Sequence, residues 1–418
     1  MIRILHGDIV SAPQMGKLNC LKDGYIISED ARIIGMYDTI PEGYRTVPVD
    51  DYSGRLILQG FSDMHLHAPQ YPMLGMGMDL QLLEWLDRYT YRTESAFSDL
   101  EYARKIYRQL ANELVQNGTT RVCMFASLHT DATLVLMEEL ETAGISGYVG
   151  KVNMDRNSKP YYQETLEQSK RETLRWIHES ERFSKVKPIL TPRFTPSCSD
   201  ELLEWLGQVA NAYNLPVQSH LSENLREIEW VKQLHPDIKR YWESYAKYGL
   251  FKNDTLMAHC VYSDELERMA IRDHGVTIVH CPDSNINVTS GIAPVKQMLD
   301  EGAKVVIGSD IAGGAQISML QVMQMTIRVS KVKRMETAYT TPFLTAAEAY
   351  YLGTSAGAVY FGEKPGFAEG NTLHAVVIED RRFPNTSSLQ MEERLERAIY
   401  RASTNEICAV YGSGDRIR

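Results

Sequence analysis

Eight short apolar runs alternate, along the middle of the chain, with segments long enough to form helices. The runs lie at residues 56–65, 119–126, 147–153, 187–193, 216–220, 255–260, 276–281 and 304–310. Helix signals stand between them, since Ser98 is placed to cap a helix over 98–117 and Gly275 to end one over 263–274. Strands that alternate with helices pair in parallel, and eight such units close a (β/α)8 barrel. The sequence therefore predicts an α/β fold with a barrel over residues 61–361.

The two ends of the chain have a different sequence pattern from the middle. Residues 2–10, 25–38 and 54–60 resemble short strands separated by turns. Near the other end, a helical segment over 345–360 and a bridge rich in glycine and proline lead to a strand-like run over 373–378. We therefore expect a small β-sandwich domain, made from residues 1–60 and 362–418 and interrupted by the barrel.

Charge and composition exclude several classes of partner. The 418 residues include 44 Lys and Arg against 54 Asp and Glu, a formal charge of −10, and no basic run carries interleaved aromatics. Nucleic acids and membranes are therefore not expected partners. No long uncharged apolar stretch or signal-peptide pattern is evident, so we expect a cytoplasmic protein. The six cysteines are scattered without a CxxC spacing, which is typical of reduced thiols. A metal site would therefore consist of histidines and carboxylates.

Polar residues with metal-binding chemistry end several of the apolar runs. His65 and His67 are two residues apart, so in a strand both side chains would lie on one face. His220, His259 and Asp310 end later runs. Because the carboxyl ends of barrel strands meet at one rim, we expect these five side chains to converge. Three imidazoles and a carboxylate suit Zn²⁺ or Fe²⁺ and leave a position open for water.

A carboxyl group near this cluster is placed for proton transfer. Glu223 follows His220 by three residues, where a strand would turn into a helix, so it can act as a general acid and base. Taken singly, His220 and His259 would more often be structural, and Asp310 could cap a helix. The coincidence of all of them at strand ends favours a catalytic site. We expect the other histidines of the barrel to be structural, namely His129, His235, His274 and His280.

These residues also carry a family resemblance. The order His65-x-His67, His220, His259 and Asp310 on an eight-stranded barrel resembles the amidohydrolase superfamily. Within it, the local segments are similar to the guanine deaminase family along nearly the whole chain. These segments are HAPQYPMLGMGMDLQLLEWLDRYTYRTE, VGKVNMDRN, TPRFTPSCS, QSHLSEN and TAAEAYYLGTSAGA.

The resemblance implies a function and a role for each matching residue. It implies hydrolysis of guanine to xanthine and ammonia by a homodimer with one Zn²⁺ per subunit, Fe²⁺ being the alternative. The implied metal ligands are His65, His67, His220 and Asp310. The implied catalytic residues are Glu223, which moves protons, with His259 and Asp310, which orient the attacking hydroxide. The implied substrate-binding residues are Gln70, Arg193, Phe194, His67, His220 and Glu223. A guanidinium or amide suits the edge of a planar base and an aromatic ring suits its face.

Three alternatives stay open at this stage. A deaminase of the same mechanism could act on adenine, cytosine or 8-oxoguanine. A binuclear amidohydrolase would use Lys151, once carboxylated, to bridge two metals. That bridging lysine sits at the end of the fourth strand in binuclear relatives, where this chain has Arg193, so we expect Lys151 to lie inside the third strand in a structural ion pair. A barrel used only as a scaffold would lack a ligand or Glu223, and none is missing.

Overall fold

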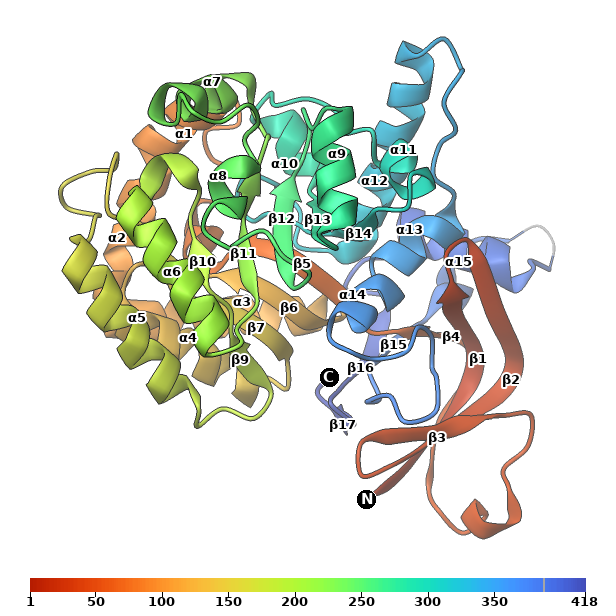
Figure 1. Ribbon diagram of the computed structural model, residues 1–418. Coiled ribbons are helices and arrows are strands. Elements are labelled where there is room, and N and C mark those ends of the chain that lie inside the picture. The colour runs from red at the N-terminus through yellow and green to blue at the C-terminus, as the bar shows by residue number, and fades with distance from the viewer. Residues whose placement is uncertain (386–387) are drawn as a thin grey trace.

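The protein has an α/β fold in the computed structural model, which describes residues 1–385 and 388–418 (Figure 1). Its centre holds two four-stranded parallel sheets. The first sheet consists, in spatial order, of β5 (Phe61–His67), β6 (Thr119–Phe125), β7 (Ser146–Gly150) and β9 (Val186–Pro188). The second consists of β11 (Val217–Leu221), β12 (Thr255–His259), β13 (Thr277–His280) and β14 (Lys304–Ile307). Strands β5, β6, β12 and β13 are buried at every residue, as in parallel sheets covered by helices.

The two parallel sheets approach each other at both edges. On one side, the short strands β8 (Val152–Asn153) and β10 (Thr191–Pro192) pair with each other, and Leu190 bridges to Val217 of β11. On the other side, β14 lies against β5, and the Asp310 amide donates to the His65 carbonyl at 2.8 Å. Gly308 permits this approach, because a Cβ atom there would lie 2.8 Å from three atoms of His65. The carboxyl ends of the first and last parallel strands therefore lie together.

Amphipathic helices cover the parallel sheets. In α3, the buried residues Tyr107, Leu110, Ala111 and Leu114 follow the spacing of one helix face. The longer helices are α3 (Leu100–Gln116), α4 (Thr130–Thr142), α5 (Leu166–Ser180), α6 (Asp200–Ala212), α7 (Leu225–Leu234), α9 (Glu265–Asp273) and α12 (Met319–Glu336). The shorter ones are α1 (Leu82–Trp85), α2 (Tyr91–Ser95), α8 (Glu243–Ala246), α10 (Pro282–Asn287), α11 (Val295–Asp300), α13 (Ala346–Leu352) and α14 (Ser355–Tyr360). Among the residues that the structure describes, no helix has both the length and the apolar character needed to cross a membrane.

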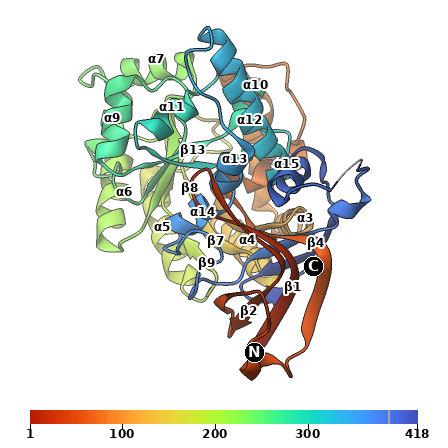
Figure 2. The same cartoon turned by 90° about the vertical axis from the view of Figure 1, so that its right-hand side faces the viewer.

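Both ends of the chain contribute to one seven-stranded sheet (Figures 1 and 2). Its spatial order is β17 (Asp415–Arg416), β16 (Ile407–Gly412), β15 (Ala375–Ile378), β4 (Val49–Gln59), β1 (Ile2–Gln14), β2 (Lys17–Glu29) and β3 (Arg32–Tyr37). Apolar side chains on one face of this sheet form a cluster of their own, whereas Val10, Leu56 and Leu58 join the main core. The sheet is therefore anchored to the rest of the fold by its other face.

The structure shows how the strands of this terminal region pair. The strands form one continuous hydrogen-bonded sheet, and this sheet curls back on itself, because Arg32 of β3 forms an antiparallel bridge to Thr372, just before β15. The β-sandwich of two stacked sheets stays a prediction. The region also contains α15 (Met391–Arg401), which was not predicted, although Leu395, Ala398 and Ile399 form its buried stripe. The i, i+3 and i+4 spacing of these three residues is that of one helix face.

Several predicted boundaries also move. The run 56–65 divides at Gly60, so that 56–59 belong to β4 of the terminal sheet and His65 belongs to β5. The runs 147–153 and 187–193 each divide into two short strands. Asp99, not Ser98, caps α3, because its carboxylate accepts the amide hydrogens of Glu101 and Tyr102. The order of the parallel strands is as predicted.

Candidate active site

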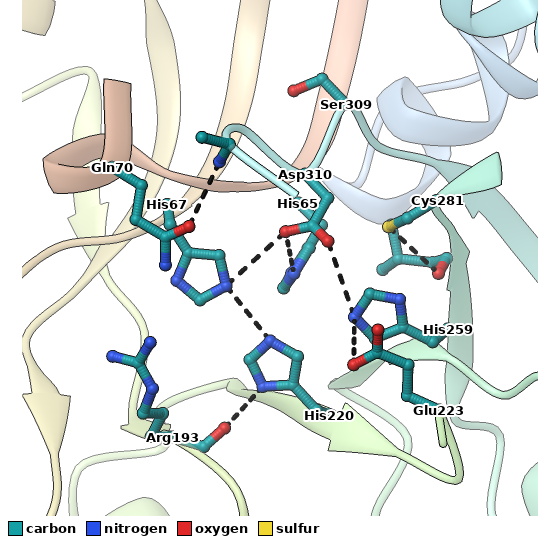
Figure 3. Close-up of polar contacts among 12 residues, drawn as sticks. His65, His67, Gln70, Arg193, His220, Glu223, His259, Cys281, Ser309 and Asp310 are labelled. Atoms are coloured by element: carbon teal, nitrogen blue, oxygen red, sulfur yellow. Dashed lines mark hydrogen bonds and ion pairs between the residues drawn. The ribbon is translucent and has the colours of Figure 1, made fainter. Parts of the chain in front are cut away.

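Histidines and a carboxylate from four strand ends converge at one point (Figure 3). The Nε2 atoms of His67 and His220 are 3.2 Å apart, and Asp310 Oδ1 lies 3.3 Å from His65 Nε2 and 3.7 Å from His67 Nε2. Two overlapping sets have ligand atoms within 4.8 Å of one another: His65, His67 and His220, and His65, His259 and Asp310. His65, His67, His259 and Asp310 are buried, and His220 is half-buried. The cluster can therefore hold a metal ion.

The surroundings of the imidazoles prepare them for metal coordination. The His220 Nδ1–H donates to the Arg193 carbonyl at 2.6 Å, which leaves the Nε2 lone pair facing the cluster. Burial, reinforced by the charge of His65, holds the pKa values of His67 and His220 well below the usual range. Both rings are therefore neutral near pH 7, the state in which imidazole binds metals. Within residues 1–385 and 388–418, the buried His65 Nε2 atom makes no hydrogen bond, so it has a lone pair to offer.

A second carboxylate, Asp63, fastens the strands that carry the ligands. It accepts hydrogen bonds from the Ser309 amide at 2.9 Å, the Ser309 hydroxyl at 2.5 Å and the His65 amide at 3.4 Å. These bonds join β5 to the segment after β14 and so set His65 beside Asp310. Sequence reasoning missed Asp63, although its even spacing from His65 and His67 along one strand was a usable signal.

Glu223 lies between β11 and α7, as expected from its spacing to His220. Its Oε2 atom is 3.5 Å from His259 Nε2, and its Oε1 atom accepts a hydrogen bond from the Ser290 hydroxyl at 3.2 Å. Burial and, second, the Asp310 carboxylate raise the pKa of Glu223 to about 8. Such a group can both take up and release a proton near neutral pH. Ser290 was not predicted, because it lies on a loop without a recognisable motif.

A cavity adjoins the cluster, and residues expected to bind the substrate line it. Gln70, Arg193 and Phe194 are among its walls, together with His67, His220, Glu223, His259 and Asp310. Three apolar residues that were not predicted, Leu82, Trp85 and Leu86, complete one wall. They belong to the segment from α1 onward, whose apolar spacing otherwise resembles ordinary helix packing.

Lys151 occupies a different place from the one predicted. It follows the last residue of β7 and precedes β8, so it is not inside a strand. Its ammonium group donates to Glu164 Oε2 at 2.8 Å and to the Val152 carbonyl at 3.2 Å, and the side chain is fully buried. The expected structural ion pair is therefore present.

Comparison with known proteins adds a family likeness over the whole chain. Residues 56–405 match the Amidohydrolase family. Guanine deaminase of Dictyostelium discoideum is 34% identical over 444 residues, which cover 100% of this chain and 98% of that protein. Guanine deaminase of Mus musculus is 37% identical over 374 residues, 86% of this chain and 82% of that protein. The crystal structure of guanine deaminase from C. acetobutylicum, with guanine bound in the active site, matches with a TM-score of 0.97 at 43% identity, covering 100% of both chains.

Proposed function

The chain belongs to the amidohydrolase family, and from this premise we propose that it hydrolyses guanine to xanthine and ammonia. The observation that carries the proposal is the cluster of histidines with Asp310 and Glu223, which opens on a cavity edged by Gln70 and Arg193. The similarity to guanine deaminases over the full chain supports guanine as the base.

We propose one Zn²⁺ per subunit, held by His65, His67, His220 and Asp310. The donor set fits, because neutral imidazoles and an ionised carboxylate are the ligands of catalytic zinc sites. Burial opposes ionisation of Asp310, but the nearby histidines, His65 first, hold its pKa well below the usual range, so it remains a carboxylate. When bound, the metal would act as a Lewis acid that lowers the pKa of water to near neutrality.

Side chains of the protein then transfer the protons. We propose that Glu223 accepts a proton from the attacking water and delivers protons to the purine ring nitrogen and to the departing amine. His259 Nε2 lies 3.5 Å from Glu223 Oε2 and 3.8 Å from Asp310 Oδ2, so these three groups can orient a single water molecule. The balance is one guanine and one water consumed for one xanthine and one ammonia formed.

The cavity walls are suited to a neutral purine. We propose that Phe194 contacts the face of the base and that Arg193 and Gln70 hydrogen-bond its edge, with His67, His220 and Glu223 beside the reacting carbon. A base without the matching acceptors would leave a buried donor unpaired, which is costly. This cost is the physical basis for selecting guanine over adenine.

The finer description of the architecture is also proposed. The bridge between Leu190 and Val217 and the contact between β14 and β5 support one closed (β/α)8 barrel over residues 61–361. The shared seven-stranded sheet supports a separate domain of residues 1–60 and 362–418. The homodimer and the cytoplasmic location stay predictions, and sedimentation velocity would test the first.

The deciding experiment follows the ultraviolet absorbance of guanine with the purified, zinc-loaded protein. Adenine, cytosine and 8-oxoguanine are assayed in parallel, and Glu223→Gln is the inactive control. Conversion of guanine to xanthine by the wild type and barely by the control is expected. If another base loses ammonia while guanine does not, the roles given to Gln70 and Arg193 are wrong. If no base reacts and the protein binds two metals, the binuclear alternative with Lys151 takes its place.

A further inference from the structure

We propose that Glu94 is the positioning residue of the base-binding site, which holds Gln70 and Arg193 in the one arrangement that recognises guanine. The inference rests on the proposed function and deepens it. Glu94 lies on α2 and is fully buried. It is the last residue of the segment HAPQYPMLGMGMDLQLLEWLDRYTYRTE, but no role was predicted for it from the sequence.

The contacts of Glu94 join four separate segments of the chain. Its Oε1 atom accepts from Gln70 Nε2 at 2.8 Å and from Arg193 NH2 at 3.0 Å. Its Oε2 atom accepts from Arg193 NH1 at 2.6 Å and from the Tyr162 hydroxyl at 2.8 Å. A carboxylate has about four acceptor sites, and all of them are used here. The Glu94 carboxylate therefore has no site left for a ligand.

The lining of the cavity separates the role of Glu94 from those of Gln70 and Arg193. Gln70 and Arg193 line the cavity, whereas Glu94 lies behind them and does not line it. Glu94 can therefore act on a bound base only through the two side chains that it holds. This distinguishes a positioning residue from a catalytic one.

Glu94 determines which atoms Gln70 presents. A carboxylate only accepts hydrogen bonds, so the Gln70 amide nitrogen must face it. The other end of the same amide is consistent, because Gln70 Oε1 accepts from the Ala312 amide at 3.2 Å. With both ends assigned by groups of fixed polarity, the amide cannot flip. Gln70 is left with one N–H to direct toward the base.

Glu94 also fixes the plane and the charge of Arg193. The two-point contact uses two of the five guanidinium N–H groups and leaves three for the cavity. The ring of Tyr91 lies under the guanidinium, 5.4 Å from its carbon, and prevents rotation on that side. Burial alone would lower the pKa of Arg193, but Glu94 outweighs it and raises the pKa. The pair carries no net charge, which matches a neutral base.

The test compares the wild type with Glu94→Gln, a variant of the same size, in zinc-loaded protein. A glutamine amide directs N–H groups at neighbours that are themselves donors, so Gln70 and Arg193 lose their fixed positions. We expect the KM for guanine to rise about tenfold or more while kcat changes less, because a binding interaction common to ground and transition states is lost. Binding of xanthine, measured by calorimetry, should weaken by a similar factor, and the zinc content should not change.

A control is available in a second, partly buried ion pair. Glu363 pairs with Arg121, and this pair is absent from the cavity walls. Glu363→Gln should therefore lower stability without changing KM. The proposal is overturned if Glu94→Gln keeps KM and xanthine binding within about twofold of the wild type, the range expected of a change without effect on the site. It is also overturned if Glu94→Gln and Glu363→Gln change KM equally.

A second variant covers the case in which Glu94→Gln does not fold. Tyr162→Phe removes one hydrogen bond from Glu94 Oε2 and leaves the Arg193 contact in place. We expect its KM to rise about threefold, as for the loss of one ordinary hydrogen bond, and an unchanged KM overturns the proposal. Failure of the proposed function is seen separately, in a wild type that does not convert guanine. In that case the affinity for xanthine tests the role of Glu94. An equal affinity for xanthine in the wild type and the variants overturns the positioning role.

Discussion

Replacing Gly308 with alanine should weaken metal binding far more than it weakens folding. The added Cβ would lie 2.8 Å from the Cβ, amide nitrogen and carbonyl oxygen of His65, and two of these atoms are backbone that cannot rotate away. Overpacking of this kind costs about 1–3 kcal/mol. At about 2.1 cal/mol/K per residue the unfolding entropy of such a chain is about 0.9 kcal/mol/K, so Tm should fall by only about 1–3 °C.

The effect on the site should be larger because the strain falls between two ligands. The Asp310 amide donates to the His65 carbonyl, so a shift of β14 away from β5 also separates the carboxylate of Asp310 from the imidazole of His65. Disturbing the groups that support a metal site typically costs about 10–100-fold in affinity. We expect Gly308→Ala to lose zinc to a competing chelator at least tenfold more readily than the wild type, on the same scale.

The assay is chelator competition with a chromogenic zinc indicator, run beside differential scanning calorimetry. Gly43→Ala is the matched control, because a Cβ atom at Gly43 would meet nothing within 4 Å. That variant should keep both its zinc affinity and its Tm. Wild-type zinc affinity in Gly308→Ala would refute the argument that the contact between β14 and β5 sets the ligand geometry. A fall in Tm far larger than expected, with affinity retained, would refute it too.

Three further predictions concern the same site. Removal of metal with a chelator should abolish deamination, and one equivalent of Zn²⁺ per subunit, counted by mass spectrometry, should restore it; a requirement for two would contradict the ligand set. Glu223→Gln should lose turnover. In metal-free protein, the Tm of this variant should rise relative to that of the wild type as the pH goes from 4.5 to about 8. The reason is that the pKa of the buried Glu223 carboxyl is raised to about 8, so its ionisation destabilises the wild type over that window. An equal Tm difference between variant and wild type at both pH values would contradict the raised pKa of Glu223. Lys151→Met should cost about 3–5 kcal/mol of stability by leaving Glu164 unpaired, yet keep activity per folded molecule and one zinc; lost zinc would favour the binuclear alternative.

The order of the parallel strands and the convergence of the ligands could be predicted because both depend on local patterns. Apolar runs of strand length carry their own signal, and His65, His67, His220, His259 and Asp310 each stand at the end of one. Parallel pairing then brings the ends together without further information. Long-range hydrogen bonding is not local. For this reason the sequence predicted that both ends of the chain share a β domain, but not which strands pair, such as β4 with β15 across more than 300 residues.

The partners of the residues that support the site could not be predicted from local patterns. Asp63, Glu94 and Ser290 act on groups that lie 246, 99 and 67 residues away in the chain. A buried carboxylate such as that of Glu94 is costly unless it is paired, so its burial shows that partners exist, but the sequence does not say which. Only the three-dimensional arrangement identifies Gln70 and Arg193 as those partners.

Two strands end earlier than the sequence predicts, and the backbone conformation that ends them also shapes the site. The predicted runs continue to Cys260 and Asp310, but the ladders stop at His259 and Ile307. There the backbone turns into the left-handed region, with φ of 74° at His259 and 49° at Asp310, and Ser222 before Glu223 has a φ of 47°. Such conformations cost about 1–2 kcal/mol for a residue other than glycine or asparagine. Glycine would relieve the strain but would supply no side chain. The chain therefore retains strained residues where the strands end, because the turn that ends each strand also directs its functional group into the site.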